Sequence, residues 1–377
     1  MASARYPAAA AFAARLAGHF ARHAATAGGE VPARAPVPDA ATVEAVVDAG
    51  FWASLQREEG IAPEISLAFL APERAGRPLL FSQPLPLSPQ ALARLAPAVQ
   101  RPGIHLGVWR GNGDALAVWG TTRTLPAFCF VLEVLEPGLL VVKHSGREPS
   151  AKFRNVAVFQ GEQVKVLSRQ APEVASHPTL LRELVGPEAA AGGLPASDLL
   201  LRLAVSMRAH RRGGTLLVVP AGSETWRGSI VGRVLYAVVP PFTELADLAR
   251  LASGDRPRGR RELAQAVEAV AGLTAVDGAT VLTDAYEVRA FGVKIGRADG
   301  RSRVEQVLVS EPVEGDTASV VAPGDIGATR HISAAQFAHD QPDALALVAS
   351  QDGRFTAFAW SAAHAMVHAY RLEALLL

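Results

Sequence analysis

The hydrophobic pattern of this chain changes once, at a run of small residues from 189 to 193, and that change limits the folds open to it. Before the run, short apolar segments are separated by turn residues, which is typical of antiparallel strands. After it, helical spacing alternates with short apolar segments, which favours a mixed sheet flanked by helices. The 377 residues also exceed the usual size of one domain. We therefore predict an α/β (α+β) protein with a helix and linker at 1–40, a β-rich antiparallel domain at 41–190 and a mixed domain at 196–377.

Eight apolar segments of strand length mark the β-rich part. They lie at residues 66–70, 79–81, 104–109, 116–120, 128–135, 139–144, 156–160 and 164–168. Residues 111–114, Gly-Asn-Gly-Asp, accept the positive φ that a tight hairpin needs. The apolar stretch 125–142 contains Glu133 and Pro137, so we expect a hairpin there and no membrane span.

In the second part we expect helices and strands to alternate. A helix capped by Ser197 precedes a buried strand at 215–219. Two further helices, at 241–253 and 262–272, flank a basic loop at 256–261. Later strands are expected at 279–282, 288–293, 304–308 and 344–349. No long internal repeat is visible in the sequence.

Composition indicates a soluble globular protein. With 49% hydrophobic residues, 19% charged residues and a net charge of +1, the chain offers no polyanion-binding surface, so we expect no nucleic-acid partner and no membrane. The single cysteine, Cys129, excludes a disulfide framework within the chain and fits a reducing cytoplasm. Its neighbours Phe128 and Phe130 favour a buried thiol. Near the N-terminus, Phe12, Leu16 and Phe20 recur at helical spacing and predict a helix that packs on a partner surface.

Two short motifs carry the chemistry that suits a phosphate ligand. Asp277-Gly278-Ala279 places a carboxylate and a glycine at the start of an expected strand. About fifty residues later, the segment 327–333, Gly-Ala-Thr-Arg-His-Ile-Ser, is expected to be a loop. It carries a hydroxyl, a cation and an imidazole, which with free backbone amides suit an anion. The candidate nucleotide-binding residues are Asp277, Gly278, Ala279, Thr329, Arg330, His331 and Ser333.

The order of these motifs resembles that of diadenylate cyclases. Residues 208–220 are similar to the helix and strand that open the cyclase domain, and residues 343–348 to a later strand. Residues 350–353 lie where that family carries Ser-Glu-Glu. The preceding β-rich domain, with Val118-Trp119-Gly120, resembles the bacterial sensor group DACNV. The resemblance implies a cyclase-like nucleotide-binding domain over 196–377.

Three positions depart from the cyclase pattern. Val276 stands where active members carry a metal-holding histidine, Gln351 replaces the first glutamate, and Ile332 replaces a second arginine. Asp277 and Asp352 remain as candidate ligands for Mg²⁺ or Mn²⁺, which would arrive with the nucleotide, and no other cofactor is implied. Asp277 would be catalytic only in an active enzyme.

We therefore expect a cytoplasmic bacterial sensor that binds an adenine nucleotide or a cyclic dinucleotide without cyclising it, and that signals to an effector protein not specified by the sequence. One alternative is an active diadenylate cyclase with a divergent metal site, which in that family acts between two facing protomers. A second alternative is an interaction module whose pocket has closed.

Other candidate features are interpreted structurally. His364 and His368 are four apart on an expected C-terminal helix, without an acidic residue or a third ligand nearby, and none of the ten histidines forms a metal-spaced pair with a nearby acid. Trp109 and Trp119 lie on neighbouring expected strands and are expected to fill the core. The basic segment 256–261 is expected to be a solvated loop.

Overall fold

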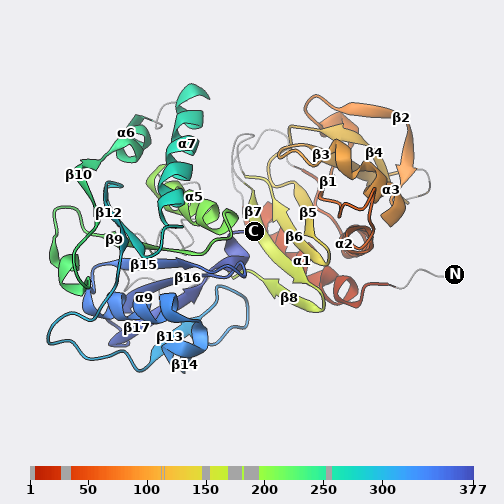
Figure 1. Ribbon diagram of the computed structural model, residues 1–377. Coiled ribbons are helices and arrows are strands. Elements are labelled where there is room, and N and C mark those ends of the chain that lie inside the picture. Colours follow the sequence, from red (N-terminus) through yellow and green to blue (C-terminus); the bar gives the residue numbers. More distant parts are fainter. Residues whose placement is uncertain are drawn as a thin grey trace. The chain divides into compact units, whose positions relative to one another are not determined.

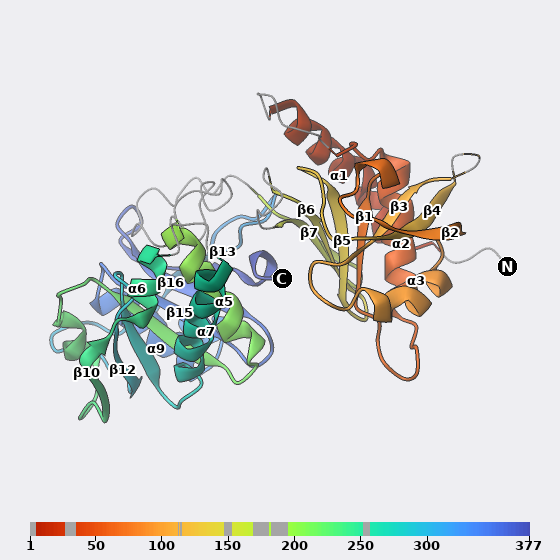
Figure 2. The same cartoon turned by 90° about the horizontal axis from the view of Figure 1, so that it is seen from above.

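The computed structural model describes residues 5–26, 35–111, 113, 115–146, 153–168, 181, 195–251 and 257–377. The chain divides into two compact units, Met1–Leu167 and Ser168–Leu377, each built on its own sheet (Figures 1 and 2). The linker predicted at 187–195 lies almost wholly outside the described residues. Among the described residues, no helix is both long enough and apolar enough to cross a membrane.

The first unit contains an eight-stranded sheet in the order β2-β4-β3-β1-β5-β6-β7-β8. The strands are β1 (Ile65–Phe69), β2 (Leu79–Pro86), β3 (His105–Arg110), β4 (Leu116–Thr122), β5 (Phe130–Glu136), β6 (Leu139–His144), β7 (Arg154–Gln160) and β8 (Gln163–Val166). All neighbours are antiparallel except β1 and β3, which run parallel. The expected β-rich domain is therefore confirmed, with one parallel pair that short turns alone did not indicate.

Helices α1 (Pro7–Thr26), α2 (Ala40–Ser54) and α3 (Pro89–Leu95) share one hydrophobic core with this sheet. Leu16 and Phe20 of α1 are buried in that core, which confirms the predicted packing face. A smaller core cluster on the sheet contains Trp119 and Cys129, both buried. The indole Nε1 of Trp119 donates to the carbonyl of Leu70 at 2.8 Å. Both residues therefore fill the core, as predicted.

The second unit contains a nine-stranded sheet in the order β10-β12-β11-β9-β15-β16-β17-β13-β14. Its strands are β9 (Gly214–Val219), β10 (Tyr236–Phe242), β11 (Ala279–Thr283), β12 (Val288–Val293), β13 (Val307–Ser310), β14 (Ser319–Val321), β15 (Leu345–Ala349), β16 (Phe355–Ser361) and β17 (Met366–Arg371). Strand β9 is buried on both faces, so it forms a continuous apolar run without alternation.

Helices cover both faces of this second sheet, which gives a three-layer unit (Figure 1). On one face, α5 (Pro195–Ala209), α6 (Glu244–Leu251) and α7 (Pro257–Leu273) pack on alternate residues of β9 such as Leu216 and Val218. On the other, α9 (Thr329–Asp340) packs on Leu217 and Val219, and it follows the short helix α8 (Pro323–Ile326). The prediction of a mixed sheet flanked by helices is confirmed.

The two units repeat one topology, although the sequence shows no repeat. The order β2-β4-β3-β1-β5-β6-β7 corresponds to β10-β12-β11-β9-β15-β16-β17, and the seven strands pair in the same parallel or antiparallel sense throughout. In each unit a helix precedes the first shared strand: α2 precedes β1, and α5 precedes β9. This helix packs on one that follows the second shared strand, which is α3 after β2 and α7 after β10. The units differ mainly in the segment that joins β4 to β5 in the first unit and β12 to β15 in the second. There the second unit inserts β13, β14, α8 and α9.

Three predicted elements outside the two motifs are wrong. The helix expected at 241–253 begins only at Glu244, because the preceding residues, with Pro240 and Pro241, form the edge strand β10, where proline is tolerated. The basic segment 256–261 is not a loop over its whole length, since α7 begins at Pro257. The expected C-terminal helix is instead the hairpin of β16 and β17, in which the side chains pair across strands.

Candidate functional site

One edge of the second sheet gathers both sequence motifs. Strands β9 and β11 run parallel and begin there, and β15 runs antiparallel to β9, so that its last residue, Ala349, pairs with Gly214. Helix α9 begins beside the same edge: a side chain built at Gly213 would lie 3.0 Å from the guanidinium of Arg330 and 3.3 Å from the carbonyl oxygen of Ala349. Segments far apart in sequence therefore meet as the motif order predicts.

Asp277 lies just before β11 and points into solvent, with 90% of its side chain exposed. Its Oδ2 atom is 2.6 Å from Nζ of Lys294, which follows β12. The hydrogen bond and the charge of Lys294 lower the pKa of Asp277, and the charge of Arg330 lowers it further. The carboxylate is therefore ionised, is paired with Lys294, and lies near enough to Arg330 for that charge to act on it.

The glycine of the first motif is required by the fold. Gly278 has a φ of +120°, and a Cβ there would lie 2.5 Å from the carbonyl carbon of Gly292 and 2.7 Å from the carbonyl oxygen of Val293. The backbone that approaches Gly278 is thus that of β12. Ala279 is buried in the core, so its side chain faces no ligand. Of this triplet, only the Asp277 side chain is fully exposed at the edge.

The second motif is the first turn of α9, not a loop as predicted. Thr329 is the first residue of the helix, and the N-cap residue Ala328 makes no side-chain hydrogen bond to the helix. The amides of His331 and Ile332 donate to the carbonyl of Ala328, so this end presents the amides of Thr329 and Arg330 together with the positive pole of the helix dipole. Thr329 and Arg330 are exposed there, and Ser333 is half-buried one turn later.

The position of His331 indicates a structural role. It is 5% exposed and contacts Phe358 edge to face, and its Nε2 lies 3.5 Å from Oγ of Ser350. Burial is the main cause that lowers its pKa, so the imidazole is neutral at neutral pH. A Cβ at Gly327 would lie 2.3 Å from Nδ1 of His331, so the glycine that opens the motif makes room for this ring.

Positive charge surrounds this end of α9. Arg330, Arg354 and Arg371 each act to lower the pKa of His331, whereas Asp352 acts to raise it. Asp352 is also paired with Arg354, at 3.4 Å between Oδ2 and Nε. Within the part of the chain that the structure describes, Arg330 forms no hydrogen bond or ion pair. Its guanidinium is thus available to an anion.

An apolar surface adjoins the charged groups. Val276 is 37% exposed immediately before Asp277, and its Cγ1 would lie 3.5 Å from a Cβ at Gly292. The ring of Tyr236 also contacts Gly292 and stacks on Phe291, with ring centroids 4.8 Å apart. Tyr236, Phe291 and Lys294 are not marked by any sequence motif, because only strand pairing brings β10 and β12 to Asp277.

The two candidate metal ligands are each engaged by a cation. Asp277 pairs with Lys294, and Asp352 pairs with Arg354 and accepts a hydrogen bond from its amide. Gln351 donates to the carbonyl of Arg212 at 3.3 Å. A divalent cation would have to displace both basic side chains, and the donor set then fits it poorly. Binding of Mg²⁺ or Mn²⁺ at Asp277 and Asp352 stays a prediction.

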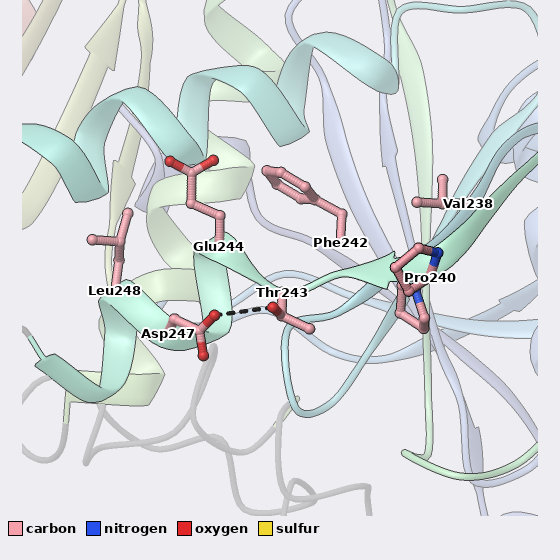
Figure 3. A pocket seen from close by; sticks show the side chains of 8 residues that line it. Val238, Pro240, Phe242, Thr243, Glu244, Asp247 and Leu248 are labelled. Atoms are coloured by element: carbon pink, nitrogen blue, oxygen red, sulfur yellow. Dashed lines mark hydrogen bonds between the residues drawn. The ribbon is translucent and has the colours of Figure 1, made fainter.

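A pocket of about 500 Å³ lies elsewhere in the unit, between β10 and α6 (Figure 3). Phe242 and Leu248 contribute apolar walls, and Glu244 and Asp247 contribute carboxylates. Asp247 accepts a hydrogen bond from Thr243 at 2.9 Å. The residues that line this pocket are apolar, hydroxyl-bearing or acidic, which disfavours a phosphate ligand.

The remaining sequence candidates are structural. His368 lies on β17 and is buried, with Nε2 2.7 Å from Oγ of Ser310, and His364 lies in the preceding turn. The ring centroids of His364 and His368 are 6.4 Å apart, but the two residues do not lie on one face of a helix as predicted.

Comparison with known proteins gives one match. Residues 32–123 match the family model described as "Probable sensor domain DACNV". The match covers less than half of the chain and spans α2 to β4 of the first unit. No curated protein matches the chain. The first unit thus contains a region similar to a probable sensor domain of the DACNV type.

Proposed function

We propose that the second unit binds an adenine nucleotide or a cyclic dinucleotide at the start of α9 and does not cyclise it. The observation that carries the proposal is the exposed first turn of α9, where Arg330 lies beside the Asp277 and Lys294 pair. Helix N-termini and arginine side chains together favour phosphate, because amides and a guanidinium donate to the same anion.

The apolar surface next to these donors supports a nucleotide over a simple anion. Tyr236, Phe291 and Val276 are partly or fully exposed and lie beside Gly292, the residue that Gly278 packs on. Aromatic faces of this kind stack on nucleobases, and stacking on an aromatic side chain is worth about 1–3 kcal/mol per base. The phosphate would lie at α9 and the base toward β10 and β12.

The internal repeat supports the same assignment. The first unit has the same seven-stranded order but no counterpart of α9 between β4 and β5. The insertion therefore supplies Thr329 and Arg330 to one unit only. The shared strand order occurs in both units, but the first turn of α9 occurs only in the second. This difference favours a second unit that binds the ligand and a first unit that responds to the binding.

The charge pattern argues against cyclisation. Transfer of a nucleotidyl group needs a metal or an equivalent cation on the departing pyrophosphate and an activated 3′-hydroxyl. Here Asp277 and Asp352 are paired with basic side chains, and Val276 offers no ligand atom. Ile332 is 38% exposed on α9 and adds no charge. Among the described residues, these pairings favour binding of a nucleotide without activation of its 3′-hydroxyl.

A thermal-shift screen of the full chain against nucleotides, cyclic dinucleotides, pyrophosphate and phosphate tests binding. We expect an adenine nucleotide or cyclic di-AMP to raise the melting temperature, because a ligand of the folded state stabilises it by RT ln(1 + [L]/Kd). Arg330→Ala should abolish the shift, whereas Arg303→Ala, at an exposed arginine that follows β12, should leave it unchanged. Loss of the ligand-induced shift in both variants, or in neither, would contradict a binding site at Arg330.

Mass spectrometry separates this function from the two alternatives. Protein incubated with ATP and Mn²⁺ should yield no cyclic di-AMP. Product that disappears in Asp277→Asn would instead establish a cyclase. Absence of any nucleotide-induced shift, with the protein folded, would favour an interaction module.

A further inference from the structure

Three histidines of the first unit meet in space, and no sequence motif singled them out. His19 and His23 lie one turn apart on α1, and His144 is the last residue of β6. One ring nitrogen from each lies within 4.8 Å of the other two. The i, i+4 spacing of His19 and His23 was the available signal, but their third partner is more than a hundred residues away.

We propose that His19, His23 and His144 form a binding site for a divalent transition metal ion, with Zn²⁺ as the best fit. Three imidazole nitrogens suit Zn²⁺ and disfavour Mg²⁺ and Ca²⁺, which require oxygen ligands. Three protein ligands also leave the fourth position of a tetrahedral ion for water or another small ligand.

The orientation of His144 supports this assignment. Its Nδ1 lies 2.9 Å from the carbonyl oxygen of Ser145. Since a carbonyl only accepts, Nδ1 carries the proton, and Nε2 is the unprotonated nitrogen that would bind a metal. A backbone carbonyl on the far ring nitrogen is the usual second partner of a metal-binding histidine. His144 is 3% exposed, so the ring is held in place by its surroundings.

The cluster has the apolar surroundings of a metal site. Phe128 lies against the rings of His23 and His144, with centroids 5.8 and 5.9 Å away, and Phe20 lies 5.9 Å from His19. The Nε2 atoms of His19 and His23 are shielded from solvent. An apolar shell of this kind limits solvent access to a metal site.

The geometry needs only a small contraction. Zn–N bonds of about 2.0–2.1 Å in a tetrahedron place ligand nitrogens roughly 3.3 Å apart. From separations of up to 4.8 Å, metal binding would require the side chains of His19 and His23 to rotate toward His144. The bound ion would join α1 to β6 and so fix the N-terminal helix on the sheet of its own unit.

Zinc binding by the full chain, prepared without a histidine tag, tests the site by competition with a chromophoric chelator. We expect one Zn²⁺ per chain, and Co²⁺ in its place should give the intense visible absorption of a tetrahedral ion. His23→Gln and His144→Gln should each weaken affinity by more than about 100-fold, since they remove direct ligands rather than outer-shell partners. His364→Gln, at an exposed histidine of the second unit, is the matched control and should bind as the native chain does.

Saturating Zn²⁺ should also raise the melting temperature of the native chain by about 5–10 °C at a hundredfold excess over Kd, and the shift should vanish in His23→Gln. His23 is half-buried on a helix surface, so this variant is expected to fold even where His144→Gln does not, and circular dichroism checks both. Native protein without stoichiometric Zn²⁺, or equal binding by the native chain and folded His23→Gln, would overturn the proposal and leave three packed imidazoles.

Discussion

Acidification should destabilise the first unit through one buried imidazole. His105 begins β3 and is 2% exposed, with Nδ1 2.7 Å from Oγ of Ser66 and its ring packed edge to face on Phe153. Burial lowers the pKa of His105 from 6.5 to about 4, although the negative charge of Glu133 acts to raise it. Glu133 is itself paired with Lys143 at 2.5 Å, which limits that opposing effect.

The size and sign of the effect follow from the two pKa values. Above pH 6.5 the imidazole is neutral in both the folded and the unfolded chain, so it adds no pH dependence. As pH falls below 6.5, the unfolded chain binds a proton that the folded chain refuses until about pH 4, so stability is lost across that window. With 1.36 kcal/mol per pKa unit, the loss is about 2 kcal/mol at pH 5 and about 3 kcal/mol once the pH is below 4.

Urea unfolding of the native chain and of His105→Gln, followed by tryptophan fluorescence at pH 8, 6.5 and 5, measures this contribution. The chain has ten histidines, so the informative quantity is the difference between the two proteins. The free energy of unfolding of the native chain should fall by about 2 kcal/mol more than that of the variant between pH 8 and pH 5. His364→Gln should follow the native chain. Parallel pH profiles for the native chain and His105→Gln would refute the reasoning.

Three substitutions test the packing of the motifs. Gly327→Ala should destabilise the second unit by about 1–3 kcal/mol in urea unfolding, because the new methyl group overlaps the ring of His331. In a His331→Ala background most of that destabilisation should disappear, and an unchanged destabilisation would contradict the contact. Gly278→Ala should cost at least as much even without any ligand, since it meets β12 backbone; a stable variant that merely loses nucleotide affinity would show that the glycine serves the ligand instead. Trp119→Phe should lower the unfolding free energy by about 1–3 kcal/mol because the carbonyl of Leu70 loses its buried donor, and retention of native stability would show that this bond is dispensable.

The sequence predicted the sheets well where apolar runs were bounded by turn residues. The hairpin of β5 and β6, for example, was predicted from the break at Pro137, and β15 was predicted to within one residue. Predictions failed where tertiary pairing overrides local preference. The segment 355–371 places His364 and His368 at helical spacing, yet it forms a hairpin in which β16 pairs with β15 and with β17.

The candidate site was predicted in part. The resemblance predicted that Asp277 and Arg330 belong to one site, and the structure brings them close enough for the charge of Arg330 to lower the pKa of Asp277. The start of α9 was missed because Ala328 has no side chain that caps a helix, so nothing local marked Thr329 as helical. The roles of Gly278 and His331 depended on contacts with β12 and Phe358, which no local pattern encodes.

Isothermal titration of ATP and cyclic di-AMP into the native chain, Arg330→Ala and Arg303→Ala tests the central claim most directly. We predict saturable binding of at least one of the two ligands by the native chain and by Arg303→Ala, and a loss of at least tenfold in affinity in Arg330→Ala, about 1.4 kcal/mol for a charge-assisted contact to phosphate. Equal affinities in all three proteins, or no heat from either nucleotide with folded native protein, would contradict a nucleotide site at the first turn of α9.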